Sequence, residues 1–148
     1  MTCQLAQINV ARGRAPLEHP SMRDFVELLD AMNALADATP GFVWRLKTEE
    51  GDSTGIRAYD DPLVIVNMSV WSGIEALQDY VYKSSHKYVF RRRKDWFEEM
   101  TSPSLALWWI PAGQIPAVED GKARLEILGK KGPTPDAFTF KETFPPPH

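Results

Sequence analysis

The sequence predicts a single α+β domain with the ferredoxin-like, split βαβ arrangement, a sheet with helices on one face. Strand and helix signals follow one another in the order β-α-β-β-α-β, and neither a linker nor an internal repeat divides the chain. A length of 148 residues suits one domain with a sizeable core. We place one domain over residues 1–148, with its core at about residues 3–131 and a proline-rich C-terminal extension at about residues 132–148.

Four segments carry strand signals. They are "CQLAQINV" at 3–10, "FVWRLKT" at 42–48, "LVIVNMSVW" at 63–71 and "LALWWIP" at 105–111. Successive side chains of a strand point to opposite faces of the sheet. Val64, Val66, Met68 and Val70 therefore share one face, which suits packing against helices.

Apolar residues at helical spacing predict the helices. One begins after Pro20, with Ser21 as its expected N-cap, and ends at the "TPG" of 39–41. A second covers about 73–85 and a last one about 117–131. Residues 86–100 form a third helix, or continue the second one after a bend. The "AFTF" at 137–140 is a candidate for one more short strand.

The other sheet face mixes apolar with uncharged polar side chains. A solvated face would carry more Lys and Glu, and a fully buried face would carry fewer amides, because an unpaired buried amide costs a few kcal/mol. The face therefore suits a partly enclosed pocket, or an interface in which the polar groups are satisfied. Its expected members are Leu5, Gln7, Asn9, Ile65, Asn67, Ser69 and Trp71.

The composition argues against several classes of protein. A net charge of −3 is unlike a dedicated nucleic-acid binder, and acids on the same helix offset much of the basic run "RRRK" at 91–94. The single cysteine, Cys3, forms no internal disulfide. No apolar run approaches the roughly 20 residues that span a bilayer. We expect a cytoplasmic protein that binds neither nucleic acid nor membrane.

Two side chains that can carry charge, those of His86 and Arg93, are candidates for a functional site. On a helix they share a face with Phe90 and Phe97. An adjacent stripe at helical spacing holds Val89, Arg93, Trp96 and Met100, so Arg93 is expected between two apolar stripes. Imidazole serves as a general base near neutral pH or as an iron ligand, and the alternative is a histidine that caps a helix or binds a backbone carbonyl. Arg93 could clamp a carboxylate, or pair with a buried acid. No metal, phosphate-loop or nucleophile motif accompanies them.

Five tryptophans are many for this length. They are typical of a core or dimer interface, and together they also suit an aromatic-lined surface for a flat apolar ligand. We take Trp44, Trp71 and Trp108 as candidate ligand contacts. Alternation along 105–111 does not decide which of Trp108 and Trp109 faces the pocket.

The segments "PGFVWR" at 40–45 and "VNMSVWSGIEAL" at 66–77, with the helix that carries His86, resemble the dimeric α/β-barrel superfamily, which includes the antibiotic-biosynthesis monooxygenases. Most of the chain resembles an uncharacterised bacterial family of that fold more closely, through "CQLAQINVAR", "RRRKDWF" and "GPTPDAFTF". The resemblance implies a homodimer in which two sheets close a barrel. Trp71 matches the strand-end tryptophan, and His86 matches the helix histidine that binds iron in haem-degrading relatives.

The expectation that follows is a monooxygenase-like enzyme, without a cofactor, acting on a small aromatic or polyketide-like compound. His86 would be its catalytic group, and Gln7, Asn9, Asn67 and Ser69 would orient the ligand. One alternative is a haem-binding protein with His86 as the axial ligand. The run of arginines after His86 and the long C-terminus differ from haem-degrading relatives. Another alternative is a non-catalytic ligand-binding or scaffold protein.

Overall fold

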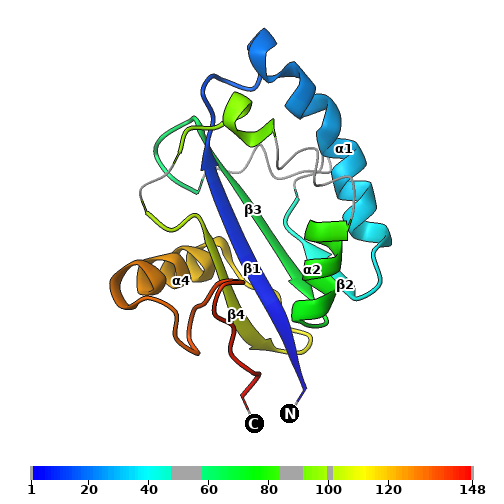
Figure 1. Ribbon diagram of the computed structural model, residues 1–148, viewed down its shortest axis with the longest axis vertical. Coiled ribbons are helices and arrows are strands. Elements are labelled where there is room, and N and C mark those ends of the chain that lie inside the picture. Colours follow the sequence, from blue (N-terminus) through cyan, green and yellow to red (C-terminus); the bar gives the residue numbers. More distant parts are fainter. Residues whose placement is uncertain (1, 48–57, 84–91, 100–101, 148) are drawn as a thin grey trace.

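A four-stranded antiparallel sheet forms the centre of the protein. The computed structural model describes residues 2–47, 58–83, 92–99 and 102–147. The strands are β1 (Cys3–Arg12), β2 (Phe42–Arg45), β3 (Val64–Trp71) and β4 (Leu105–Pro111). Their order is β2-β3-β1-β4, and every pairing is antiparallel (Figure 1). This confirms the predicted fold class and the predicted strands.

The helices follow the split βαβ order. A short 3-10 helix, η1 (Pro20–Met22), leads into α1 (Arg23–Ala38), while α2 (Ile74–Lys83) connects β3 to β4 and α4 (Val118–Lys131) follows β4 (Figure 1). Residues 92–96 are also helical. The two crossover helices touch each other, since the hydroxyl of Tyr80 donates to the carbonyl oxygen of Met32 over 3.1 Å.

The start of α1 differs from the prediction. Its N-cap is Met22, which makes no side-chain capping bond, and Ser21 lies inside η1 instead. The backbone N–H of Ser21 donates to His19 Nδ1 at 3.1 Å. Pro20 suits the first position of a helix because its φ angle is fixed and it has no N–H to leave unpaired. The first helical turn therefore begins at Pro20, one residue before Ser21, which the sequence predicted as the N-cap.

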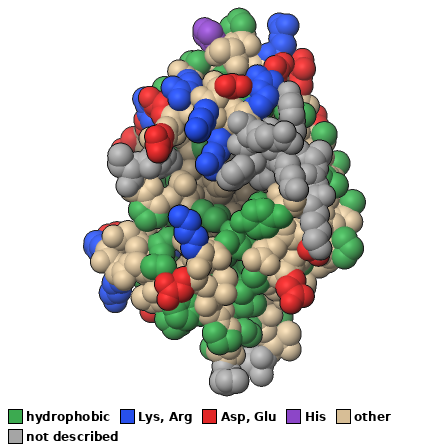
Figure 2. Space-filling view, in the orientation of Figure 1, with side chains coloured by type: hydrophobic (Ala, Val, Ile, Leu, Met, Phe, Trp, Pro, Cys, Tyr) green, Lys and Arg blue, Asp and Glu red, His purple; other side chains and the backbone are tan. Residues whose placement is uncertain are grey.

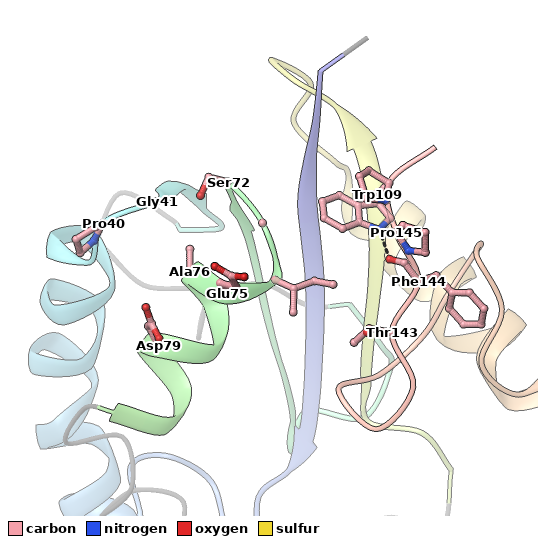
Figure 3. A pocket seen from close by; sticks show the side chains of 13 residues that line it. Pro40, Gly41, Ser72, Glu75, Ala76, Asp79, Trp109, Thr143, Phe144 and Pro145 are labelled. Carbon is pink, nitrogen blue, oxygen red and sulfur yellow. Dashed lines mark hydrogen bonds between the residues drawn. The ribbon is translucent and has the colours of Figure 1, made fainter. Parts of the chain in front are cut away.

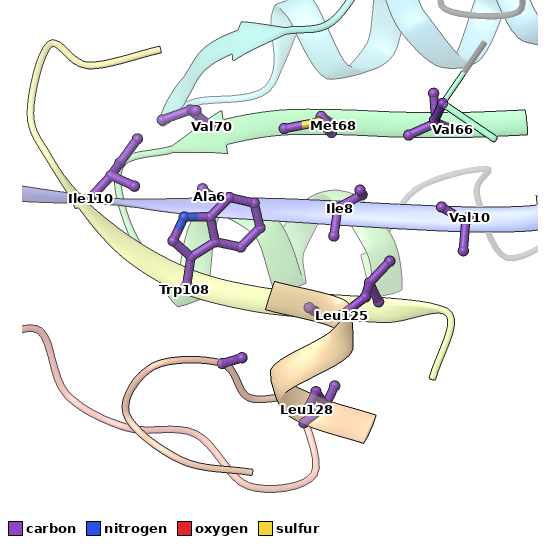
Figure 4. Close-up of a cluster of buried hydrophobic side chains, with 13 residues drawn as sticks. Ala6, Ile8, Val10, Val66, Met68, Val70, Trp108, Ile110, Leu125 and Leu128 are labelled. Carbon is purple, nitrogen blue, oxygen red and sulfur yellow. The ribbon is translucent and has the colours of Figure 1, made fainter. Parts of the chain in front are cut away.

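One face of the sheet packs against α4. Ile8 is fully buried there, and the α4 backbone comes so close at Gly121 that an added Cβ would lie 2.6 Å from Ile8 Cδ1. Figure 4 shows Leu125 and Leu128 of α4 beside the side chains of the sheet. The sheet residues of this core are Ala6, Ile8, Val10, Val66, Met68, Val70, Ala106, Trp108 and Ile110.

The opposite face packs against α1 and α2. Leu5 and Trp71 of the sheet form one cluster with Ala36 of α1 and Leu77 of α2. A further cluster joins Phe25 of α1 to other residues at the Ile65 end of β3. The crossover helices therefore cover the face that carries the polar residues.

The valine-rich face packs against a helix as predicted, and that helix is α4. Helices were expected on one face of the sheet only, and this was wrong, because α1 and α2 cover the other face. Right-handed β-α-β crossovers fix the face on which α1 and α2 lie. Alternation along a strand separates two faces, but both faces here are apolar enough to be covered, so the pattern does not say which helix takes which face.

The C-terminal segment follows the outer edge of β4. Leu107 and Phe138 exchange two backbone hydrogen bonds, of 2.8 and 2.9 Å, so "AFTF" does contribute an isolated β-bridge. Trp109 Nε1 donates to the carbonyl oxygen of Phe144 at 2.8 Å. Phe138 is fully buried, and Phe144 packs against the same cluster.

Candidate functional site

Four side chains form a hydrogen-bonded polar row across β1 and β3, on the face that α1 and α2 cover. The antiparallel register places Gln7 opposite Ser69 and Asn9 opposite Asn67. Gln7 Nε2 donates to Asn67 Oδ1 at 2.7 Å and to Ser69 Oγ at 2.8 Å. Ser69 Oγ also accepts from Trp71 Nε1 at 2.8 Å. We call Gln7, Asn67, Ser69 and Trp71 the polar row.

The polar row runs from a closed end to an open end. Trp71 is 1% exposed, Gln7 5% and Ser69 6%, whereas Asn67 and its neighbour Asn9 are exposed. In Figure 2 the surface is hollowed near its centre, over the middle of β1 and β3 as they run in Figure 1. Basic side chains lie above this hollow and hydrophobic ones below it. The amides of Asn67 and Asn9 are thus open to solvent at one end of the row.

The closed end of the row is aromatic and neutral. The rings of Trp71 and Tyr80 stack, with centroids 5.3 Å apart and 26° between their planes, and Phe42 meets Trp71 edge-on at 5.3 Å. Burial raises the pKa of Tyr80 to about 12, so its phenol stays protonated at neutral pH. The polar row itself holds amides, a hydroxyl and an indole, none of which titrates near neutral pH.

A second aromatic group lies at the Ile65 end of β3. Trp96 is fully buried against Phe25, with ring centroids 5.5 Å apart, and Ile65 packs against the same cluster. The guanidinium carbon of Arg92 lies 4.7 Å from the centre of the Trp96 ring. Arg92 also pairs with Asp24 at 2.9 Å, which ties the 92–96 helix to α1.

The structure brings together five of the residues that the sequence singled out. Two others lie elsewhere: Trp44 and Trp108 belong to the core on the α4 side of the sheet. Trp108 is 1% exposed, and it faces α4 because Trp109 takes the opposite face. The five that share one face are Gln7, Asn9, Asn67, Ser69 and Trp71.

The remaining candidates lie on the segment after α2. His86 and Phe90 fall outside the described residues, so their predicted roles stay predictions. Arg93 is exposed on the 92–96 helix, whereas sequence spacing placed it between two apolar stripes. Its neighbour Arg92 is the half-buried arginine that lies over an aromatic ring.

Sequence reasoning missed Tyr80 and Trp96 as parts of the site. Tyr80 lies three residues after Leu77, so helical spacing already places both on one face of α2. Trp96 stood on a predicted apolar stripe with Val89 and Met100, but nothing in the sequence joins that stripe to β3. Contact between them depends on the tertiary fold.

A separate open cavity of about 820 Å³ lies between α2 and the C-terminal segment. Figure 3 shows Glu75 and Asp79 of α2 on one side and Trp109 with Phe144 on the other. None of the polar row lines it. Because Trp109 lines this cavity, it is the tryptophan of β4 that faces the crossover helices.

Metal-binding and membrane-spanning features are absent from the part of the chain that the structure describes. No three His, Cys, Asp or Glu side chains in that part are grouped so that they could hold a metal ion. Of its helices, none has both the length and the apolar character that a membrane span requires.

Comparison with known protein families assigns the chain to one of them. A family model described as "Domain of unknown function (DUF3291)" matches residues 4–148. The chain belongs to the DUF3291 family. This confirms the expected membership of an uncharacterised family. No curated protein is significantly similar to this DUF3291 member.

Solved structures share its fold at low sequence identity. A protein of unknown function from Nitrosomonas europaea, NE2512, has 13% identity and a TM-score of 0.52, over 78% of this chain and 97% of that one. SnoaB, a cofactor-independent oxygenase from Streptomyces nogalater, has 16% identity and a TM-score of 0.49, over 76% and 95%. The monooxygenase ActVA-Orf6 of Streptomyces coelicolor has 15% identity and a TM-score of 0.45, over 77% and 92%. The likeness to NE2512 shows a common fold and leaves activity open.

Proposed function

We propose that this DUF3291 protein binds a flat aromatic compound over the polar row and oxidises it with molecular oxygen, without a cofactor. The observation that carries the proposal is the row itself: a neutral, hydrogen-bonded set of side chains that is buried at Trp71 and open at Asn67. Such a mixture of aromatic surface and a few convergent polar groups is typical of small-molecule sites.

The open end of the row offers hydrogen bonds to a ligand. Gln7 Nε2 is already shared between Asn67 and Ser69, which fixes the orientation of both amides. Asn67 Nδ2 and Gln7 Oε1 make no bond to any of the described residues. An amide N–H held in place by its neighbours can stabilise negative charge that develops on a ligand oxygen. The row therefore suits a compound whose carbonyl becomes an enolate.

The reaction class follows from that anion. A base removes a proton from the carbon next to the aromatic rings, and the resulting carbanion–enolate transfers electrons to O₂ to give a hydroperoxide. Loss of water then leaves a new carbonyl, so that one oxygen atom of O₂ enters the product and the other leaves as water. For anthrone the balance is anthrone plus O₂ giving anthraquinone plus water. The polar row supplies no base, and we assign that role to His86.

Anthrone is a suitable probe for the test. We expect oxygen uptake and formation of anthraquinone, measured with an oxygen electrode and by absorbance, in protein to which no metal, flavin or haem has been added. Asn67→Ala should lower kcat at least about tenfold, the scale of losing one hydrogen bond to a charged group. Ser102→Ala, an exposed substitution outside the site, is the matched control and should leave the rate unchanged.

His86→Ala should abolish turnover while anthrone still binds. A rate no higher than that of buffer, or Asn67→Ala with wild-type kcat, would contradict the proposed reaction. Binding of anthrone without oxygen uptake would point to a ligand-binding protein instead. A Soret band at stoichiometric haem would favour haem binding.

A further inference from the structure

Helix α4 covers the face of the sheet that the crossover helices leave free. The core residues on that face of β1, β3 and β4 are at most 7% exposed within a single chain. Ile8 and Trp108 are among them, and they belong to one cluster with Leu125 and Leu128 of α4 (Figure 4). In a barrel closed by two sheets, each sheet must present the face that its own crossover helices do not cover. In this chain that face is already buried.

The α4 backbone lies directly against β1 at Gly121. An added Cβ there would lie 2.6 Å from Ile8 Cδ1 and 3.1 Å from Ile8 Cβ, so there is no room even for a methyl group. Two sheets that pack face to face are about 10 Å apart, with side chains of both filling the space between them. Helix backbone already fills that space beside β1, so a second sheet cannot pack there while α4 is in place.

Polar contacts hold α4 to two other segments of the same chain. Lys122 Nζ donates to the carbonyl oxygen of Ala58 at 2.6 Å, and it lies 4.5 Å from the centre of the Tyr59 ring. Arg124 Nη1 donates to the carbonyl oxygen of Asp136 at 2.9 Å. The segment that precedes β3 and the segment that follows α4 therefore both fix the position of the helix.

The chain stays beside its own β4 before and after α4. Residues 112–117 connect the end of β4 to the start of α4, which is a short connection. After the helix ends, Phe138 exchanges two backbone hydrogen bonds with Leu107 of β4. Both ends of α4 are thus tied to the same strand, which favours packing within one chain over exchange of the helix between two copies.

We propose that α4 closes this face of the sheet within its own chain, in the place that a second copy's sheet takes in a dimeric barrel. Association of two copies through these faces would require α4 to move away and expose the whole core on its side of the sheet. The polar row lies on the other face and comes from β1 and β3 of one chain. Each chain therefore carries this part of the proposed site by itself.

An engineered disulfide between β1 and α4 tests the proposal. A Cβ at position 121 would lie 3.1 Å from Ile8 Cβ, slightly closer than the roughly 3.5–4.5 Å of disulfides, so a small shift allows the bond. Ile8→Cys with Gly121→Cys, in a Cys3→Ser background, is checked for folding by circular dichroism, oxidised with copper–phenanthroline and run on a non-reducing gel. Ile8→Cys with Gly129→Cys is the control, because Gly129 is exposed and lies about 12 Å further along the same helix.

We expect a bond within one chain for the Gly121→Cys pair and none for the control. A mixture of the single variants Ile8→Cys and Gly121→Cys, unfolded and refolded together, should give no disulfide-linked dimer. An intrachain bond in a particle heavier than the 16.8 kDa chain would still support the proposal, and would place the contact between copies on another surface.

Three results would overturn the proposal. A bond that joins two chains, in the double variant or in the mixture, would place α4 on the sheet of a second copy. A folded double variant that forms no bond would show that α4 does not lie against β1. A bond of equal yield in the Gly129→Cys control would show that the helix has no fixed position on the sheet.

A second pair of cysteines at the edge of the helix decides the question if the buried pair prevents folding. Tyr59→Cys and Lys122→Cys, again with Cys3→Ser, replace two half-buried side chains that touch each other. A short bismaleimide should join these cysteines within one chain, whereas Lys131→Cys in place of Lys122→Cys, at an exposed position of the same helix, should give no intrachain product. A product that joins two chains, or no product from folded protein, would contradict closure by the chain's own helix.

Discussion

Replacing the two glycines of α4 by alanine should have opposite effects on stability. Both Gly121 and Gly129 lie inside the helix, where alanine is favoured over glycine by about 0.5–1 kcal/mol. At Gly129 the nearest atom to a new Cβ is Pro103 Cδ at 3.6 Å, an ordinary contact. Gly129→Ala should therefore raise the free energy of unfolding by about 0.5–1 kcal/mol.

At Gly121 the same methyl group meets Ile8. The distances are 2.6 Å to Cδ1, 3.1 Å to Cβ and 3.3 Å to Cγ1. Rotation of the side chain can move Cδ1, but Cβ is fixed to the backbone of β1, so α4 itself must move. Overpacking of this kind costs about 1–3 kcal/mol, which outweighs the helix preference.

Urea unfolding followed by circular dichroism measures both variants. We expect Gly121→Ala to be less stable than Gly129→Ala by about 1–3 kcal/mol, which corresponds to several degrees in Tm for a chain of this size. Adding Ile8→Val to Gly121→Ala should cost less than Ile8→Val alone, because it removes the 2.6 Å contact. Equal stabilisation by both glycine substitutions would refute the close approach of α4 to the sheet.

Two other predictions concern the crossover helices. Burial raises the pKa of Tyr80 to about 12 from its usual 10, so the phenol ionises first in the unfolded chain. Its contribution to stability is full below pH 10 and falls between pH 10 and 12. In urea unfolding at pH 8 and 11.5, Tyr80→Phe should remove about 2 kcal/mol of the loss between the two pH values. If wild type and Tyr80→Phe lose the same amount, the buried phenol is not its source. Gly41→Ala should cost at least about 2 kcal/mol in thermal unfolding, because φ is +90° and a Cβ would lie 2.5 Å from Ala76 Cβ. Gly113→Ala, with φ +92° and open space, should cost only about 1 kcal/mol, and a similar loss in both would argue against that clash.

The fold could be predicted from the sequence because its signals are local. The alternation in 63–71 and the helical stripe after Pro20 each depend on neighbouring residues, and both elements are present. The same reasoning grouped Gln7 and Asn9 with Asn67 and Ser69, because a period of two assigns strand residues to faces. The antiparallel register then brought these side chains into direct hydrogen bonds.

What could not be predicted depends on the way elements pack. Trp108 and Trp109 are adjacent and chemically alike, so only the tertiary fold shows that Trp108 meets α4 and Trp109 meets the C-terminal segment. Trp44 likewise lies on the α4 side of the sheet, opposite the polar row, and only the tertiary fold shows this. Arg92 lies over the Trp96 ring and Arg93 is exposed, since a rotation of about 100° per residue decides which side chain meets that ring.

The C-terminal segment also has a consequence for solubility. Without it, β4 would be an edge strand with the sequence "LALWWIP", long, apolar and free of charge. Such an edge is a template for pairing with other unpaired strands. The two backbone bonds between Leu107 and Phe138 occupy part of that edge, and the buried ring of Phe138 fastens the segment to it. A chain cut after Gly132 would therefore be expected to aggregate, so the proline-rich extension serves as protection against self-association.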